Sequence, residues 1–220
     1  MRQALVLVLL AALVIPGCLD LSAARVPDRL LEGAGGNGWE KDARGSQAEP
    51  SGGMTSKAQT LAYVHPAGSG AGYQGTLSVT TYRNLLSPSE SSVRDALQAK
   101  LKGDVESKGV ALQGAARQGT RTVANHAQSY WFAYEGKVST GGTFSTDARV
   151  KIFGEVFRCP TAKTVVATVG LAQVTSVRSV GGVPVSTDED ATTWNAIVGD
   201  PGGTIDGARL SDGLAYNVQC

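Results

Sequence analysis

The sequence predicts an α+β domain in which an antiparallel β-sheet is packed by two helices, behind an apolar leader and a flexible tether. Most segments after residue 57 alternate apolar with polar residues or are rich in β-branched and aromatic ones, which is typical of strands. Two other segments show helical spacing behind capping residues. Because the strands follow one another with short turns, the α+β class is favoured.

The leader has the pattern of an export signal, with Met1-Arg2 followed by an apolar run from Ala4 to Ile15. This run is too short to cross a bilayer as a helix, which needs about 20 residues. The segment Ile15-Pro16-Gly17-Cys18 that follows resembles the lipobox of bacterial-type lipoproteins. In that family a lipid is attached to the cysteine and the chain is cut directly before it.

The resemblance implies a lipoprotein signal peptide over residues 1–17 and lipid attachment at Cys18. It also implies a lipid-anchored protein of the cell membrane or cell envelope, on the extracytoplasmic side. The match departs from the usual pattern at Ile15 and Pro16, where Leu and a small residue are common. A cut after Ala24 stays open as an alternative, because Ser22 and Ala24 are the small residues that ordinary signal peptidase prefers.

Residues 18–56 are rich in Gly, Ser, Ala and charged residues, with Pro27 and Pro50 among them. Such a composition lacks the apolar content that offsets the entropy cost of ordering. We therefore expect a flexible tether over residues 18–56 and a single α+β domain over residues 57–220.

The domain opens with strands at residues 61–64 and 77–82, joined by a Gly-rich connection over 66–75. A helix is expected from Pro88 to Lys108. Ser87 is placed to cap its first turn, and Glu90 completes a capping box. Four apolar residues at a spacing of four form one core-facing stripe on this helix, namely Val93, Leu97, Leu101 and Val105.

Four strands are expected next, at residues 110–114, 129–134, 149–159 and 164–174. Their large apolar groups alternate on both faces, so the centre of the sheet should be covered on both sides. Ser186 and Glu189 then predict a second capped helix that ends at Gly199. Residues 208–220 are expected to form a short strand or an extended tail.

The helix 88–108, the strand leading into Asn125-His126-Ala127, and the aromatic strand Tyr130-Trp131-Phe132 together resemble the PsbP-like fold. The match covers residues 57–198 and rests on pattern. It implies a binding or assembly module and not a catalyst. The Trp-bearing opening segment of that family is missing here unless Trp39 serves, and the segment ending at Cys220 is extra.

The chain has three cysteines, Cys18, Cys159 and Cys220. If Cys18 carries lipid, an even pair remains in an oxidising compartment, which suggests a Cys159–Cys220 disulfide. Two free thiols are the alternative. A zinc site is not expected, since two cysteines and two distant histidines lack ligand spacing. The formal net charge of +1 argues against a nucleic-acid partner.

Few residues suggest chemistry. The two Gly-rich stretches at 33–38 and 70–75 match a nucleotide-binding pattern only in letters, because neither joins a strand to a helix. His126 lies close to Ser129 in sequence, as in a Ser/His hydrolase, but no serine occupies a nucleophile turn of the G-x-S-x-G kind. We therefore expect no catalytic residue, no metal and no cofactor.

The remaining candidates for ligand binding are one turn histidine and an aromatic cluster: His126, Tyr130, Trp131, Phe132 and Tyr134. Together these observations predict a lipid-anchored extracytoplasmic binding or scaffold protein of the cell envelope. Its partners would be the membrane, through the N-terminal lipid, and an envelope protein or a small ligand. An envelope hydrolase with an unidentified nucleophile and a structural stabiliser of a membrane complex are the alternatives.

Overall fold

The computed structural model describes residues 23–32, 38–51, 56–66, 73–84, 89–139, 147–160, 164–205 and 210–220. Most of these residues belong to strands. In chain order the elements are α1 (Arg29–Glu32), β1 (Glu40–Ser51), β2 (Ser56–His65), β3 (Gly75–Asn84), α2 (Glu90–Ser107), β4 (Val110–Thr122), β5 (Gln128–Ser139), β6 (Asp147–Arg158), β7 (Thr164–Gln173), β8 (Val177–Val180), β9 (Val183–Ser186) and α3 (Thr192–Val198).

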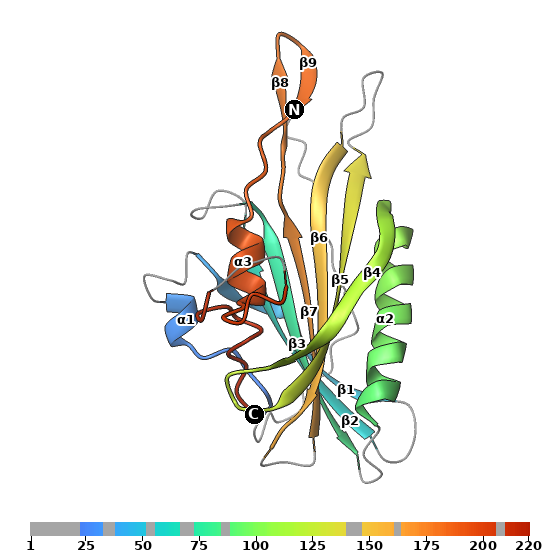
Figure 1. The fold of residues 1–220 in the computed structure, drawn as a ribbon, viewed down its shortest axis with the longest axis vertical. Helices are drawn as coiled ribbons and strands as arrows, with labels where there is room; N and C mark the ends of the chain where they lie inside the picture. Colours follow the sequence, from blue (N-terminus) through green and yellow to red (C-terminus); the bar gives the residue numbers. More distant parts are fainter. Residues whose placement is uncertain are drawn as a thin grey trace.

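The main sheet has seven strands in the order β1-β2-β3-β7-β6-β5-β4, and every neighbouring pair is antiparallel. A separate two-stranded sheet, β8–β9, projects at one end of the long axis, and the C-terminus lies near the other end (Figure 1). The protein is thus mainly antiparallel β-sheet with some helix. None of the described helices is long and apolar enough to cross a membrane.

Each face of the sheet contributes to its own buried cluster. On one face Phe153 and Phe157 of β6 join Trp194 and Ile197 of α3 in one hydrophobic cluster. On the other face Ile152 of β6 belongs to a cluster that includes buried residues of α2. The alternation of β6 residues between the two clusters follows from the two-residue period of a strand.

Helix α2 lies within the range that the apolar stripe predicts, and Leu101 and Val105 of that stripe are buried. Its described N-cap is Ser89, whose side chain accepts a hydrogen bond from the Ser92 amide at 3.1 Å. The expected capping role of Ser87 and Pro88 lies outside the described residues.

The prediction of a flexible tether up to residue 56 is wrong for the described part of that segment. Ala24, Val26, Leu30 and Trp39 are buried in the same cluster as the sheet residues. The Ala24 amide donates to Thr81 Oγ1 at 2.9 Å. These few apolar residues pack against the sheet. The average composition of residues 18–56 does not reveal this, because most of the other residues in the segment are small or polar.

The β1 strand shows the same limit, because it has no large apolar side chain and yet pairs with β2 on both sides of one irregularity between Asp42 and Gln47. Pairing satisfies the backbone amides and carbonyls whatever the side chains are. At the start of this region, the Lys41 ammonium donates to Asp28 of the preceding segment at 3.0 Å and lowers the pKa of that carboxyl.

The expected capping box of the second helix is also wrong. Ser186 ends strand β9, and helix α3 begins only at Thr192. Its N-cap residue, Ala191, makes no capping hydrogen bond through its side chain. The Asp190 carboxylate instead accepts from the Thr192 amide at 2.8 Å.

The predicted Cys159–Cys220 disulfide is confirmed, with a Cα–Cα distance of 5.8 Å across a sequence separation of 61. It joins the end of β6 to the last residue of the chain. The C-terminal segment is irregular, and its extended part is a single antiparallel bridge between Gln219 and Arg25.

The close fit of the core on the α2 face makes Gly154 a sensitive position. A Cβ added there would lie 2.1 Å from Phe132 Cζ, whereas a Cβ at Gly103 in α2 would meet nothing within 4 Å. We expect Gly154→Ala to lower the free energy of unfolding by about 2 kcal/mol, as overpacked cores do. The matched control Gly103→Ala should raise it by about 0.5–1 kcal/mol. Denaturant unfolding of both variants checks this, and equal effects would contradict the packing described.

Candidate functional site

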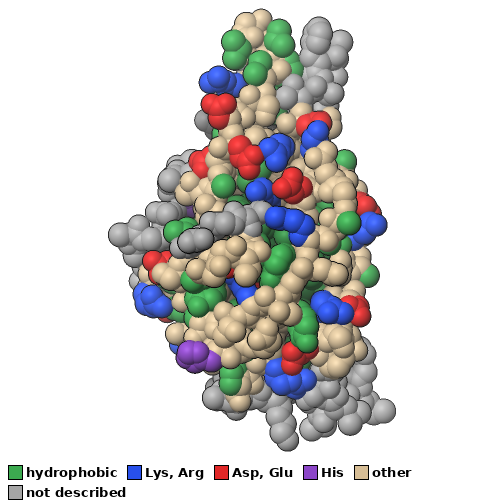
Figure 2. Space-filling view, in the orientation of Figure 1, with side chains coloured by type: hydrophobic (Ala, Val, Ile, Leu, Met, Phe, Trp, Pro, Cys, Tyr) green, Lys and Arg blue, Asp and Glu red, His purple; other side chains and the backbone are tan. Residues whose placement is uncertain are grey.

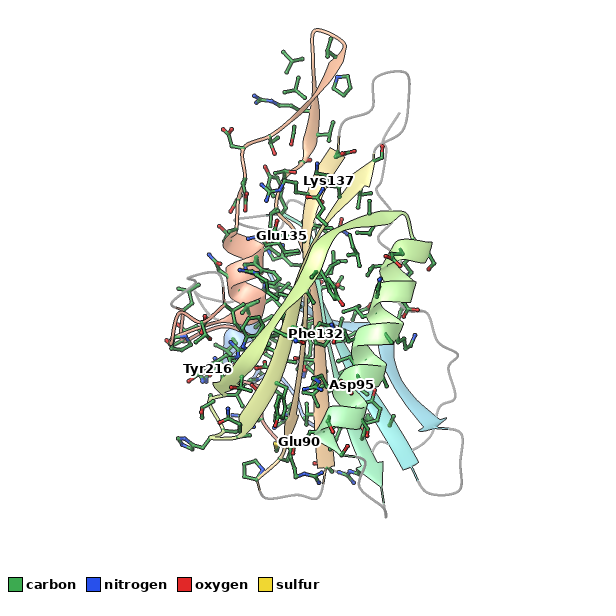
Figure 3. All side chains as sticks on the ribbon, turned by 45° about the vertical axis from the view of Figure 1, so that its right-hand side comes forward. Glu90, Asp95, Phe132, Glu135, Lys137 and Tyr216 are labelled. Carbon is green, nitrogen blue, oxygen red and sulfur yellow. A yellow bond between two sulfur atoms is a disulfide. The ribbon has the colours of Figure 1, made fainter. Side chains whose placement is uncertain are left out.

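The aromatic cluster expected on β5 is divided between the two faces of the sheet. Trp131 belongs to the buried cluster on the α3 face, and Phe132 and Tyr134 belong to the cluster on the α2 face. Figure 3 shows Phe132 in the middle of the molecule. These three rings are core residues here, so they do not line one common groove.

The two tyrosines of this strand contact helix α2. The Tyr134 hydroxyl accepts a hydrogen bond from Gln98 Nε2 at 3.0 Å. The Arg94 guanidinium lies over the half-buried Tyr130 ring, 5.4 Å from its centroid. Both contacts fix the helix on the sheet, because each joins a polar group of α2 to an aromatic residue of β5.

His126 lies exposed in the turn between β4 and β5, away from the buried rings. Its backbone has a positive φ of 65°, and its amide donates to the Val123 carbonyl at 2.9 Å. The nearby Ser129 hydroxyl is buried and lies 2.6 Å from Glu155 Oε1 and 3.1 Å from the Arg121 carbonyl oxygen. The structure therefore engages this serine in the core and does not present it to His126.

A buried ion pair, which no local pattern in the sequence predicts, lies between the sheet and the end of α3. Arg121 Nε donates to Glu155 Oε1 at 2.6 Å, and Arg121 Nη2 donates to Glu155 Oε2 at 2.7 Å. The side chains are 4% and 0% exposed. The guanidinium and the carboxylate thus form two hydrogen bonds side by side, which is the strongest geometry for an arginine–carboxylate contact.

The same guanidinium also reaches the C-terminal third of the chain. Arg121 donates to the carbonyl groups of Val198 and Gly199, where helix α3 ends. It further lies over the Tyr216 ring, 5.6 Å from its centroid. Because both charges are shut away from solvent and hydrogen-bonded, the pair serves to fix α3 and the C-terminal segment on the sheet, and it offers no access to a substrate.

Three of the four large apolar side chains that are exposed among the described residues belong to the β8–β9 hairpin; the fourth is Leu210. Val180, Val183 and Val185 are 54%, 52% and 40% exposed. The register pairs Val180 with Val183 and Arg178 with Val185, so all four side chains share one face of the hairpin. We call these three valines with Arg178 the hairpin face. Figure 2 shows hydrophobic side chains gathered at the end of the molecule where this hairpin projects.

The tip of the hairpin is a two-residue turn, Gly181-Gly182, with φ angles of 59° and 85°. Two positive φ values in succession are the requirement of a type I′ turn, which glycine meets without strain. The letters Val-Gly-Gly-Val are therefore a hairpin signal that sequence reasoning could have used and missed.

Hydrogen bonds join the two arms of the hairpin at its root, and one arm also contacts the main domain. The backbone amide of Thr187 donates to the Ser176 carbonyl, and the Asp190 amide donates to the Val174 carbonyl, each at 2.8 Å. The Tyr73 hydroxyl lies 2.6 Å from Thr187 Oγ1. An apolar tip on a fixed root is a form that suits recognition of another molecule.

The charged groups beside this root belong to β5, β6 and the segment after β9. Arg149 Nη1 lies 2.6 Å from Glu189 Oε2, and Arg149 Nη2 lies 3.5 Å from Glu135 Oε2. Among the described residues, no group of three or more His, Cys, Asp or Glu side chains could hold a metal ion.

Comparison with known proteins gives no relative, because no family model, no curated protein and no solved structure matches the chain. The hairpin face is thus a candidate site on its chemistry and geometry alone.

The buried ion pair yields a direct test. Glu155→Gln removes one charge and leaves the Arg121 guanidinium buried without its counterion, which should lower the free energy of unfolding by about 3 kcal/mol or more. The control is Glu155→Leu combined with Arg121→Met, which removes both charges and should recover much of that loss. Denaturant unfolding with the disulfide intact measures both. A loss below about 1 kcal/mol for Glu155→Gln would show that the pair does not hold the C-terminal segment.

Proposed function

We propose that this protein is a lipid-anchored binding or scaffold protein of the cell envelope, held on the extracytoplasmic side through Cys18. The observation that carries the proposal is the burial of Ala24, six residues after that cysteine. It bears on which of the two possible cleavage sites can leave the described fold intact.

A cut after Ala24 would remove a residue that the fold uses. Ala24 is fully buried, and its amide donates to the hydroxyl of Thr81, which is itself buried. A chain that began at Arg25 would lose that contact and leave the Thr81 hydroxyl without its donor. A cut before Cys18 keeps the contact, which supports the lipoprotein interpretation over ordinary secretion.

The disulfide supports the extracytoplasmic location. Cys159 and Cys220 are bonded, and disulfides persist mainly in oxidising compartments outside the cytosol. This pairing also leaves Cys18 as the one cysteine of the chain that is not in the bridge.

The hairpin face is the surface that we assign to binding a protein partner in the envelope. Its three exposed valines would pack against apolar groups of the partner. Arg178 beside them would pair with an acidic group on the partner. We propose a binding protein rather than an enzyme. The engagement of the Ser129 hydroxyl with Glu155 counts against a hydrolase in which Ser129 pairs with His126. A structural stabiliser of a membrane complex would use the same surface.

The architecture that goes with this proposal is a sheet covered by α2 on one face and by α3 on the other. Contacts of α2 with β4, β6 and β7, and of α3 with β3 and β7, support it. The PsbP-like resemblance belongs to the same proposal, supported by the position of α2 between β3 and β4.

Labelling with a fatty-acid probe tests the anchor. Cells that express the full chain should incorporate the probe into the protein, and Cys18→Ser should abolish incorporation, because the thiol is the attachment atom. The control Ser22→Ala leaves the thiol in place and should be labelled like the wild type. Equal labelling of Cys18→Ser and wild type, or none of either, would refute lipid attachment at Cys18.

Photo-crosslinking in living cells tests the hairpin face. A photoactivatable residue at Val183 should give a crosslinked protein product, because its side chain is more than half exposed on the apolar face. The same residue at Lys102, an exposed position on α2, is the matched control and should give none. A product of the same mass and yield at both positions, or none at Val183, would contradict the assignment.

A further inference from the structure

We infer that the anchored protein faces the lipid headgroups with the end of the sheet opposite the hairpin, so that the hairpin face points away from the bilayer. This inference rests on the proposed lipid attachment at Cys18. It assigns a second surface, whose occupant is the membrane that holds the anchor. We call this surface the anchor end and define it by Arg25, Arg83, the β4–β5 turn, Arg158 and Cys220.

The entry point of the chain into the fold identifies the anchor end. Arg25 pairs with Gln219 through two backbone hydrogen bonds of 2.9 and 2.8 Å, and Gln219 precedes the disulfide-bonded Cys220. Asn125 Nδ2 of the β4–β5 turn donates to the Val218 carbonyl at 3.3 Å. The first described residues therefore lie beside the C-terminus, at the end of the sheet where β6 finishes (Figure 1).

The length of the link restricts how far this end can stand from the bilayer. Five peptide steps separate Cys18 from Ala23, where the described fold begins. At full extension they span at most about 18 Å. Strand β6 alone has 12 residues, which corresponds to about 40 Å between the anchor end and the hairpin end. A lipid on Cys18 can thus bring the anchor end to the headgroups but cannot by itself reach past it to the hairpin.

The described charges favour the same orientation. Three arginines belong to the anchor end, Arg25, Arg83 and Arg158, and Arg83 and Arg158 lie at matching positions of β3 and β6 opposite the start of β7. Arg158 pairs with Glu90 at 3.2 Å, and Figure 3 shows Glu90 near this end of the molecule. Basic side chains next to a lipid anchor are attracted to anionic headgroups.

The hairpin end carries charges of both signs. There Arg149 pairs with Glu135 and Glu189, and Lys151 also pairs with Glu189. Lys137 lies opposite Arg149 in the sheet, and Arg178 belongs to the hairpin face. Because bases and acids are mixed at this end, its charge gives no net attraction to anionic headgroups, and the orientation follows from the entry point and the length of the link. An outward-pointing hairpin face then meets proteins and not lipid, which fits the partner that we proposed for it.

Depth-dependent fluorescence quenching tests this orientation on the full lipidated protein. The protein is reconstituted into vesicles of phosphatidylcholine and phosphatidylglycerol that carry a spin label on the headgroup. A fluorophore is attached at one of three exposed positions: Gln128→Cys at the anchor end, Lys102→Cys on α2, and Val183→Cys at the hairpin tip. The parent chain treated with the same dye controls for labelling of its own cysteines.

We expect strong quenching at Gln128→Cys, weaker quenching at Lys102→Cys and almost none at Val183→Cys. Quenching that is equal at all three positions, or strongest at Val183→Cys, would overturn the inference while leaving the lipid anchor intact. Flotation of each sample separates this from a failure of the proposed function. A protein that carries no fatty acid and does not float with the vesicles would overturn the anchor, and the orientation with it.

Discussion

The pairing of Arg25 with Gln219 at one end of the sheet is the constraint on which the rest of the proposed function depends. Arg25 and Gln219 exchange backbone hydrogen bonds, and the neighbouring Ala24 is fully buried. The Cys159–Cys220 disulfide ties the same corner to β6. Because the N-terminal segment is fixed there, any lipid attached a few residues earlier must hold this end of the molecule.

The candidate partner surface is placed relative to that corner by the rigid sheet. Strand β7 leads within a few residues into the β8–β9 hairpin, and the Tyr73 hydroxyl contacts Thr187 at the root of the hairpin. The buried Arg121–Glu155 pair holds the end of α3 on the sheet. With the proposed anchor at one end of the sheet and the hairpin face at the other, the sheet would hold the proposed partner contact at a fixed distance from the membrane.

The parts of the fold that sequence analysis predicted are those whose pattern repeats locally. The apolar residues on both faces of β5 and β6, the spacing of Leu101 and Val105, and the even cysteine pair each follow from a local rule, and the structure confirms them. The parts that it missed depend on partners distant in sequence. Arg121 and Glu155 are 34 residues apart in the sequence, and Ala24 and Thr81 are 57 residues apart, so no local pattern predicts either contact. The aromatic residues of β5 suit either a core or a ligand groove, and the structure places Trp131, Phe132 and Tyr134 in the core.

The most direct test is to determine the N-terminal residue of the mature protein. Mass spectrometry of the protein extracted from the membrane fraction should find a terminal peptide that begins at Cys18, carries acyl groups and contains Ala24. A mature chain that begins at Arg25 would contradict this proposal, because it would lack Ala24, whose amide donates to Thr81 on the sheet.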